Sequence, residues 1–236
     1  MDEEDSTDPI ITEFFFVRHA PVIKNSGSLP AFDPPISEGP YPVEALCKTL
    51  PKQADWFISP LKRSRQTAAL FRNILCPASE ILDKALTEQD FGLWHNKEID
   101  AVWEQVKHGP RHNWSFLMPE VIPPRGESFD AQISRVALWC KTIELRSYKR
   151  PQIVFTHAGT IRAVMAHLLG LSSNRAQSLV IPNFGCLHAH LMDAAHAEQH
   201  HGGPRRRTDE FRVLRLHPKK NSNSAQQGQK EFNSKF

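Results

Sequence analysis

Two arginines and two histidines of this chain stand where chemistry is expected, because each follows a short apolar run directly or within one turn. These residues are Arg18 and His19, Arg63, and His157. An arginine offers forked donors that match a phosphate group. A neutral imidazole can act as a nucleophile or a base near neutral pH. Together these residue types indicate a phosphate pocket in which an imidazole takes up the phosphoryl group.

The three apolar runs, 14–17, 55–58 and 152–156, predict the strands that would position these side chains. Short continuous apolar runs are typical of strands that are buried on both faces of a parallel sheet. In open α/β sheets, ligands bind outside the carboxyl ends of the strands, and these ends share one edge. The four residues are therefore expected to converge, although polar residues at three strand ends can also arise by chance.

The segments between these strands read mainly as helices. A helix over 61–75 would carry Lys62 and Arg63 in its first turn, against the helix dipole, which favours an anion bound there. The other expected helices cover about 42–50, 98–107, 129–146 and 159–169, and further strands are expected at 81–82, 185–192 and 210–216. Ser128 is placed to cap one helix, and Gly170 is placed to end another.

Length and composition limit the classes of protein to which this chain can belong. The 236 residues suffice for one α/β domain, expected over 13–217, between an acidic tail (1–12) and a polar tail (218–236) that we expect to be disordered. A net charge of +3 is too weak to indicate a nucleic-acid partner. No apolar run approaches the roughly 18 residues of a membrane span, and the acidic N-terminus is unlike a signal peptide. Four scattered cysteines without a Cys-x-x-Cys motif favour reduced thiols in the cytoplasm.

Six segments between residues 18 and 162 form a more specific pattern. They are Arg18-His19-Ala20 with Asn25, and the stretches 35–39, 59–68, 88–94, 126–128 and 156–162. In order and in residue types they resemble the motifs of the histidine phosphatase (phosphoglycerate mutase-like) superfamily. The proline-rich loop before Gly39, which contains Asp33, is broadly like the α-ribazole phosphatase branch. The sequence departs from the family motifs at Ala20, which replaces glycine, and at His95-Asn96, which replaces Glu-Gly; the motif before Gly39 is also one residue short.

The resemblance implies a three-layer α/β/α fold with a mostly parallel central sheet, and a role for each matching residue. His19 would be the nucleophile that becomes phosphohistidine, and Glu88 would protonate the leaving group, with Asp90 as a rival acid. The phosphoryl oxygens would be bound by Arg18, Arg63 and His157, and by the backbone N–H group of Ala158. Asn25 would line the mouth of the pocket.

The activity that this resemblance implies is hydrolysis of a phosphomonoester of a small metabolite in two steps, with no cofactor. No metal is expected, because the arginines and His157 would supply the positive charge. The segment 94–114, rich in tryptophan and histidine, would cover a small-molecule site. A homodimer is the expected assembly if the chain associates with itself, and the sequence leaves its oligomeric state open.

Other functions stay open at this point. A phosphoglycerate-type mutase is the enzymatic alternative, a phosphatase acting on phosphoproteins would need a shallower mouth, and a phosphate-binding interaction protein would show little turnover. A metal site is a further alternative. His188 and His190 alternate on a predicted strand, near His196, His200 and His201, but this spacing matches no standard site. A solvated turn is therefore the favoured interpretation of this histidine-rich stretch.

Overall fold

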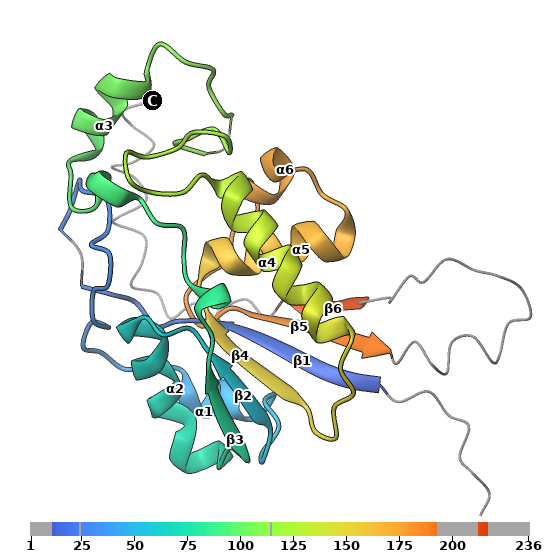
Figure 1. The fold of residues 1–236 in the computed structure, drawn as a ribbon. Helices are drawn as coiled ribbons and strands as arrows, with labels where there is room; N and C mark the ends of the chain where they lie inside the picture. The colour runs from blue at the N-terminus through green and yellow to red at the C-terminus, as the bar shows by residue number, and fades with distance from the viewer. Residues whose placement is uncertain (1–10, 24, 114, 193–211, 217–236) are drawn as a thin grey trace, which may run out of the picture.

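A single sheet with β1 at its centre organises the computed structural model, which describes residues 11–23, 25–113, 115–192 and, for the backbone, 212–216. Its strands are β1 (Ile11–Arg18), β2 (Asp55–Ile58), β3 (Ser79–Leu82), β4 (Gln152–Thr156), β5 (Cys186–Met192) and β6 (Arg212–Leu216). Within the described residues the strand order is β3-β2-β4-β1-β5-β6. Strands β1 to β4 are parallel, β5 is antiparallel to β1, and β6 is antiparallel to β5 (Figure 1).

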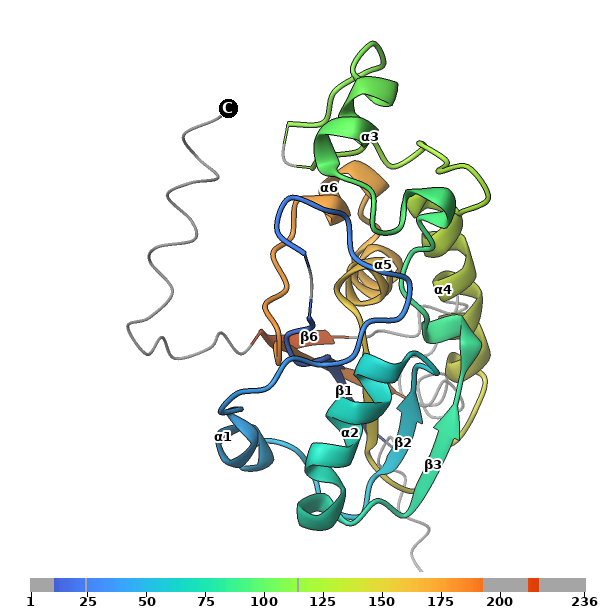
Figure 2. The ribbon, with the colours of Figure 1, turned by 90° about the vertical axis from the view of Figure 1, so that its left-hand side faces the viewer.

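Helices cover both faces of this sheet. They are α1 (Val43–Cys47), α2 (Lys62–Leu75), α3 (Ile99–Val106), α4 (Phe129–Glu144), α5 (Ala158–Leu169) and α6 (Ser173–Gln177), with short 3-10 turns at Lys84–Leu86 and Gly92–Trp94. One core lies between the sheet and the α1/α2 pair, and a second lies between the sheet and the α4/α5 pair (Figures 1 and 2). The predicted three-layer fold with a mostly parallel sheet is confirmed.

Strand β1 shows why an unbroken apolar run was needed at this place. Successive side chains of a strand point to opposite faces. Phe14 and Phe16 accordingly pack in the α4/α5 core, while Phe15 and Val17 pack in the α1/α2 core. All four are at most 5% exposed. From Phe14 to Val17 the strand is buried on both faces, which favours four apolar residues in a row, and the first charged side chain after them is Arg18, where β1 ends.

The predicted helix boundaries follow from local chemistry. The hydroxyl of Ser128 accepts a hydrogen bond from the N–H group of Ala131 at 3.1 Å and so caps α4. Gly170 ends α5 in the left-handed conformation, with φ of 61°. The remaining predicted helices and strands are all present, with boundaries that differ by a few residues.

One boundary was wrong. The acidic tail was expected to cover 1–12, with the domain beginning at residue 13. Ile11 and Thr12 instead belong to β1 and pair with Met192 and Leu191 of β5. Hydrogen bonds from a distant strand fix this part of the backbone, and the local sequence carries no signal of them. The single turn of α6 was not predicted either, because so short a helix has little periodicity. Residues 1–10, 193–211 and 217–236 lie outside the described part, so the predictions for both tails and for the histidine-rich turn stay untested.

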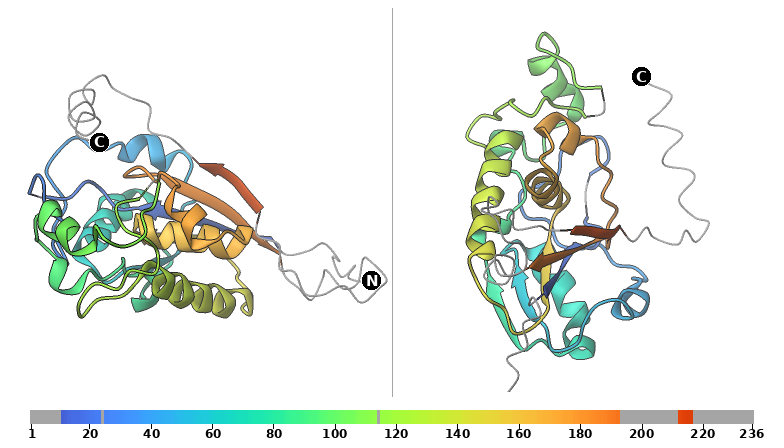
Figure 3. Two further views of the ribbon diagram at one scale, coloured as in Figure 1. Left: turned by 90° about the horizontal axis from the view of Figure 1, so that it is seen from above. Right: turned by 90° about the vertical axis from the view of Figure 1, so that its right-hand side faces the viewer.

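The segment around α3 lies beyond the carboxyl ends of the parallel strands. It is seen at the top of Figure 2 and at the top of the right-hand panel of Figure 3. It has a small core of its own, formed by Trp94, Val102 and Leu117. In the described part of the chain, no helix is both long enough and apolar enough to traverse a bilayer. All four cysteines are free thiols, as expected.

Candidate active site

The carboxyl ends of the adjacent strands β1, β4 and β2 bring the predicted residues to one place. His19 follows β1 and His157 follows β4, and their ring centroids lie 5.1 Å apart. Arg63 enters from the first turn of α2 and is 7% exposed. The structure therefore brings together two imidazoles and an arginine, although His19 and His157 are 138 residues apart in the sequence.

His19 is held as a neutral imidazole with one defined tautomer. Its Nδ1 lies 2.6 Å from the carbonyl oxygen of Ala20. Because a carbonyl oxygen only accepts hydrogen bonds, Nδ1 carries the proton and Nε2 keeps its lone pair. Burial lowers the pKa of His19 to about 4, helped by the charges of Arg63 and Arg18, whereas the Ala20 carbonyl and Glu88 oppose the shift. Nε2 is thus an unprotonated nucleophile at neutral pH.

Residues far away in the chain fix the backbone around His19. The N–H group of Ala20 donates to the Thr67 hydroxyl at 2.9 Å, and this hydroxyl donates to the carbonyl of Arg63. The side-chain amide of Asn183 donates to the carbonyl of His19 at 2.8 Å. Neither Thr67 nor Asn183 was singled out from the sequence. Ala20, the departure from the family motif, is fully buried in the α1/α2 core, so its methyl group is accommodated.

Arg63 and His157 form a fixed pair. The Nε group of Arg63 donates to His157 Nδ1 at 3.1 Å, and His157 Nε2 lies 2.7 Å from the hydroxyl of Ser59. Burial, together with the charges of Arg63 and Arg18, holds the pKa of His157 well below its usual value. His157 is therefore neutral and has protein partners at both nitrogens. The predicted contact between His157 and a phosphoryl group would require one of these bonds to open, and it stays a prediction.

Arg18 has a buried donor available for an anion. Its guanidinium donates through Nη1 to the carbonyl of Ile181. Its Nε is buried and finds no hydrogen-bond partner among the described residues. A buried donor without a partner is costly, and an anion would satisfy it. Arg162 of α5, whose Nε donates to the carbonyl of Leu179 at 2.7 Å, adds positive charge that acts on both Arg18 and Glu88. The sequence assigned no role to Arg162.

Glu88 is held next to the start of α5. One carboxylate oxygen accepts the N–H group of Gly159 at 3.2 Å, and the other accepts the amide of Gln132 at 3.1 Å. Burial by itself would raise the pKa of Glu88. The Gln132 hydrogen bond, the charge of Arg63 and the Gly159 N–H group outweigh burial and keep this pKa below its usual value. Glu88 is therefore a carboxylate at neutral pH when the site is empty of substrate.

The rival acid, Asp90, has another structural role. Its carboxylate accepts the N–H group of Gly92 at 2.7 Å and lies 2.9 Å from His95 Nε2. The other nitrogen of His95 lies 3.0 Å from the carbonyl oxygen of Pro30. His95, the second departure from the family motif, thus fastens the turn after Glu88 to the loop that follows β1.

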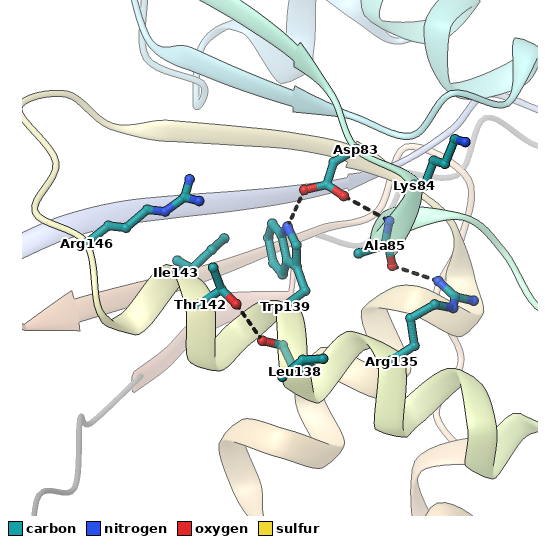
Figure 4. Close-up of a pocket in the computed structure, with 9 residues that line it drawn as sticks. All are labelled: Asp83, Lys84, Ala85, Arg135, Leu138, Trp139, Thr142, Ile143 and Arg146. Atoms are coloured by element: carbon teal, nitrogen blue, oxygen red, sulfur yellow. Dashed lines mark hydrogen bonds between the residues drawn. The ribbon is translucent and has the colours of Figure 1, made fainter.

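Arg135 anchors the segment that leads to Glu88. It donates to the carbonyl of Ala85 at 2.7 Å (Figure 4). It also donates to the carbonyl of Thr87 at 3.3 Å, and it pairs with Glu127. Figure 4 shows Arg135 at one end of a separate pocket of about 390 Å³ between α4 and the Lys84–Leu86 turn. This pocket is lined by none of the predicted site residues.

The roles predicted for Asn25 and Ala158 stay predictions. Asn25 is an exposed residue of the loop after β1, and its carbonyl accepts the N–H group of Ser28 at 3.4 Å. This loop is joined to the α3 segment through a bridge between Ser28 and Glu98. Ala158 is buried as the first residue of α5, where its N–H group belongs to the unpaired first turn of a helix.

The predicted covering segment packs mainly on itself. Trp94 is 4% exposed, and the guanidinium of Arg111 lies 5.2 Å from the ring centroid of Trp103. His112 reaches back to the carbonyl of Asn174 at 3.0 Å. A direct contact between this segment and a substrate stays a prediction.

Comparisons with known proteins identify the family of this chain. A family model described as "Histidine phosphatase superfamily (branch 1)" matches residues 14–200. Phosphoserine phosphatase 1 of Hydrogenobacter thermophilus is 28% identical over 187 residues, which cover 75% of this chain and 82% of that protein.

Solved structures show the same fold. A mycobacterial glucosyl-3-phosphoglycerate phosphatase, 21% identical, superposes with a TM-score of 0.64 over 77% of this chain and 91% of that one. A phosphoglycerate mutase from Bacillus anthracis, 18% identical, superposes with a TM-score of 0.66 over 88% of this chain and 93% of that one. At these identities the similarity establishes the fold, and no more than the fold.

Proposed function

This chain belongs to the histidine phosphatase superfamily, and we propose that it hydrolyses a phosphomonoester of a small metabolite through a phosphohistidine at His19. The single observation that carries the proposal is the state of His19. Its ring is neutral, its Nε2 keeps a lone pair, and the charges of Arg18 and Arg63 act on it. A neutral nucleophile among guanidinium groups suits attack on a phosphate dianion, which would repel an anionic nucleophile.

The first step forms the phosphoenzyme. His19 Nε2 attacks phosphorus, and the bond between phosphorus and the ester oxygen breaks while Glu88 protonates the departing alcohol. Glu88 is ionised in the free site, so the proton has to be acquired on binding. A phosphate dianion beside Glu88 raises the pKa of its carboxyl group, because a nearby like charge disfavours ionisation. The proton carried by a phosphate monoanion serves the same purpose.

The second step regenerates the enzyme. Glu88, now a carboxylate again, takes a proton from water, whose oxygen attacks the phosphorus of phosphohistidine. The nitrogen–phosphorus bond breaks, and inorganic phosphate leaves. Arg18 and Arg63 stabilise the charge on the phosphoryl oxygens throughout, so the reaction as proposed needs no metal ion or cofactor.

The substrate class is inferred from the relatives. The names of the two phosphatases above specify phosphoserine and glucosyl-3-phosphoglycerate, which are small phosphate esters that also carry a carboxylate. Arg162, close enough to act electrostatically on Glu88 and Arg18, is a suitable partner for such a second anionic group. The branch near α-ribazole phosphatases, the homodimer and the cytoplasmic compartment stay predictions.

The test is product analysis with p-nitrophenyl phosphate, phosphoserine and 3-phosphoglycerate, for the native chain, His19→Ala and Glu88→Gln, with and without EDTA. We expect the native chain to release phosphate at the same rate with EDTA, His19→Ala to be inactive, and Glu88→Gln to be slowed about 100-fold or more. An isomerised phosphoglycerate without phosphate release would establish the mutase instead. Tight phosphate binding without turnover of any ester would establish the interaction protein.

A further inference from the structure

Glu13, His188 and His190 converge on one face of the sheet, far from the catalytic residues; we call them the Glu13 cluster. In the antiparallel pairing of β1 with β5, Glu13 lies opposite His190, and Phe15 lies opposite His188. Directly opposite residues, and residues two apart on one strand, share a face. Glu13 Oε1 lies 3.0 Å from His188 Nε2 and 3.7 Å from His190 Nε2. The three ligand atoms all lie within 4.8 Å of one another.

We propose that the Glu13 cluster is a binding site for a divalent transition-metal ion, with zinc as the ion that fits its donors best. Two imidazoles and one carboxylate are a donor set typical of zinc, with bonds of about 2.0–2.2 Å. Donors on a tetrahedron of that size lie about 3.4 Å apart. The two distances from Glu13 fall on either side of this value, so small side-chain rotations complete the geometry, and water takes the fourth position.

A second observation concerns the nitrogen of His190. Its Nε2 is buried and makes no hydrogen bond within the described part of the chain, and its distance of 3.7 Å from Glu13 is too long for one. A buried polar atom without a hydrogen bond calls for an explanation, and an unseen ion is one of the established ones. A proton shared between Glu13 and His188 would leave His190 Nε2 without a hydrogen bond, whereas a metal ion would be coordinated by this nitrogen.

Aromatic packing orients the cluster in advance. The ring of Phe15 stacks on that of His188, with centroids 4.1 Å apart and planes inclined by 14°. The rings of His188 and His190 lie 5.1 Å apart at 78°. A fixed imidazole loses less conformational freedom when it coordinates an ion, which favours binding.

The site would be structural, because it lies at the far end of β1 from the reaction. His19 lies six positions after Glu13, and a strand rises about 3.3 Å per residue, so the two sites are roughly 20 Å apart. A bound ion would join the start of β1 to the end of β5. It would raise thermal stability and leave the chemistry at His19 unchanged, so the inference does not depend on the proposed function.

The test is metal titration of the full chain after its metal content has been removed, by calorimetry with Zn²⁺ and by the absorption spectrum of Co²⁺. The parent carries His196→Ala, His200→Ala and His201→Ala, which removes the histidines that follow β5 in the sequence. We expect one equivalent of Zn²⁺ to bind, a tetrahedral Co²⁺ spectrum, and a rise of the melting temperature on the order of 5 °C at saturating Zn²⁺.

Variants of the cluster decide the result. Glu13→Gln, which keeps the size of a half-exposed side chain, and His190→Ala should each weaken Zn²⁺ binding by about 100-fold. His167→Ala is the matched control, because it removes a histidine that pairs with one carboxylate, Glu144 at 2.7 Å, and should leave Zn²⁺ binding unchanged. Absence of stoichiometric binding in the parent, or equal binding by parent, Glu13→Gln and His190→Ala, would overturn the proposal.

Discussion

The charge of His19 is set by a balance between burial and its neighbours. Burial and two guanidinium groups favour the neutral ring, while the Ala20 carbonyl and Glu88 favour the charged one, and the pKa settles at about 4. An unperturbed histidine would be partly protonated at pH 6 and could not attack phosphorus in that form. The environment of His19 therefore extends the pH range in which the nucleophile is neutral to lower pH.

This balance predicts the acid limb of the pH profile. For the native chain, log kcat/KM should rise with pH through an apparent pKa near 4, as His19 loses its proton, and should fall above about 6, where the substrate loses its second phosphate proton. The measurement is kcat/KM for p-nitrophenyl phosphate between pH 3.5 and 8, after checking that activity lost in acid returns at pH 6. Glu88→Gln should keep the acid limb, because His19 sets it. A limb near 6.5 would show that His19 titrates as an ordinary histidine.

Residues were located from the sequence where their position in the chain carries the signal, whereas their catalytic roles stay predictions. Arg18, His19 and His157 are identifiable because an apolar run ends immediately before them. Thr67, Gln132 and Asn183 were not predicted, since each reaches the site through a hydrogen bond to an atom 44 or more residues away. No local pattern marks such a residue.

At the level of elements, the start of α5 lies so close to Glu88 that a side chain at position 159 would displace the Glu88 carboxylate. A Cβ atom at Gly159 would stand 2.2 Å from Glu88 Oε1 and 2.8 Å from Gln132 Oε1. The backbone of Gly159 is ordinary helix, so space rather than conformational freedom requires glycine here.

Gly159→Ala should therefore push Glu88 away from its position. A displacement near 1 Å at a catalytic group can cost about 100-fold, so we expect a fall of this size in kcat, with a smaller change in KM. Gly109→Ala is the control, because its nearest atom, the carbonyl oxygen of Val106, would lie at an ordinary 3.4 Å. Equal activity of the two variants would show that Glu88 is not held as described.

The elements themselves were largely predictable, and their junctions were not. Apolar runs and caps define β1, β2, β4, α2, α4 and α5, because burial and capping are local in sequence. The pairing of Ile11 with Met192 depends on contacts between distant residues. The same is true of the link from His95 to Pro30. The Glu13 cluster is a further example, since the histidine spacing alone matched no metal site and the third donor comes from another strand.

At the scale of the whole molecule, the site makes folding dependent on pH. His19 and His157 have pKa values below 6.5 in the folded chain, so between pH 6.5 and 4 the unfolded chain binds more protons than the folded one. Stability therefore rises with pH through this window and is lost on acidification. Glu88, with a lowered pKa, acts in the same direction below its unfolded value of 4.5.

His19 alone should account for about 2 kcal/mol of the loss in unfolding free energy between pH 7 and pH 5. Urea unfolding at both pH values, for the native chain and His19→Ala, measures this contribution. His19→Ala should lose less stability on acidification by about that amount, while the cavity left by the substitution lowers stability equally at both pH values. The same loss in both proteins would contradict a depressed pKa of His19.

The central claim, a phosphoryl group carried by His19, is tested most directly by trapping the intermediate. The native chain is mixed with p-nitrophenyl phosphate, quenched in base within the first turnover, and analysed by mass spectrometry of its peptides. We expect one phosphoryl group per chain, located on His19, lost in acid, and absent from His19→Ala. Turnover without any phosphorylated residue, or a phosphoryl group that survives acid or forms in His19→Ala, would contradict it.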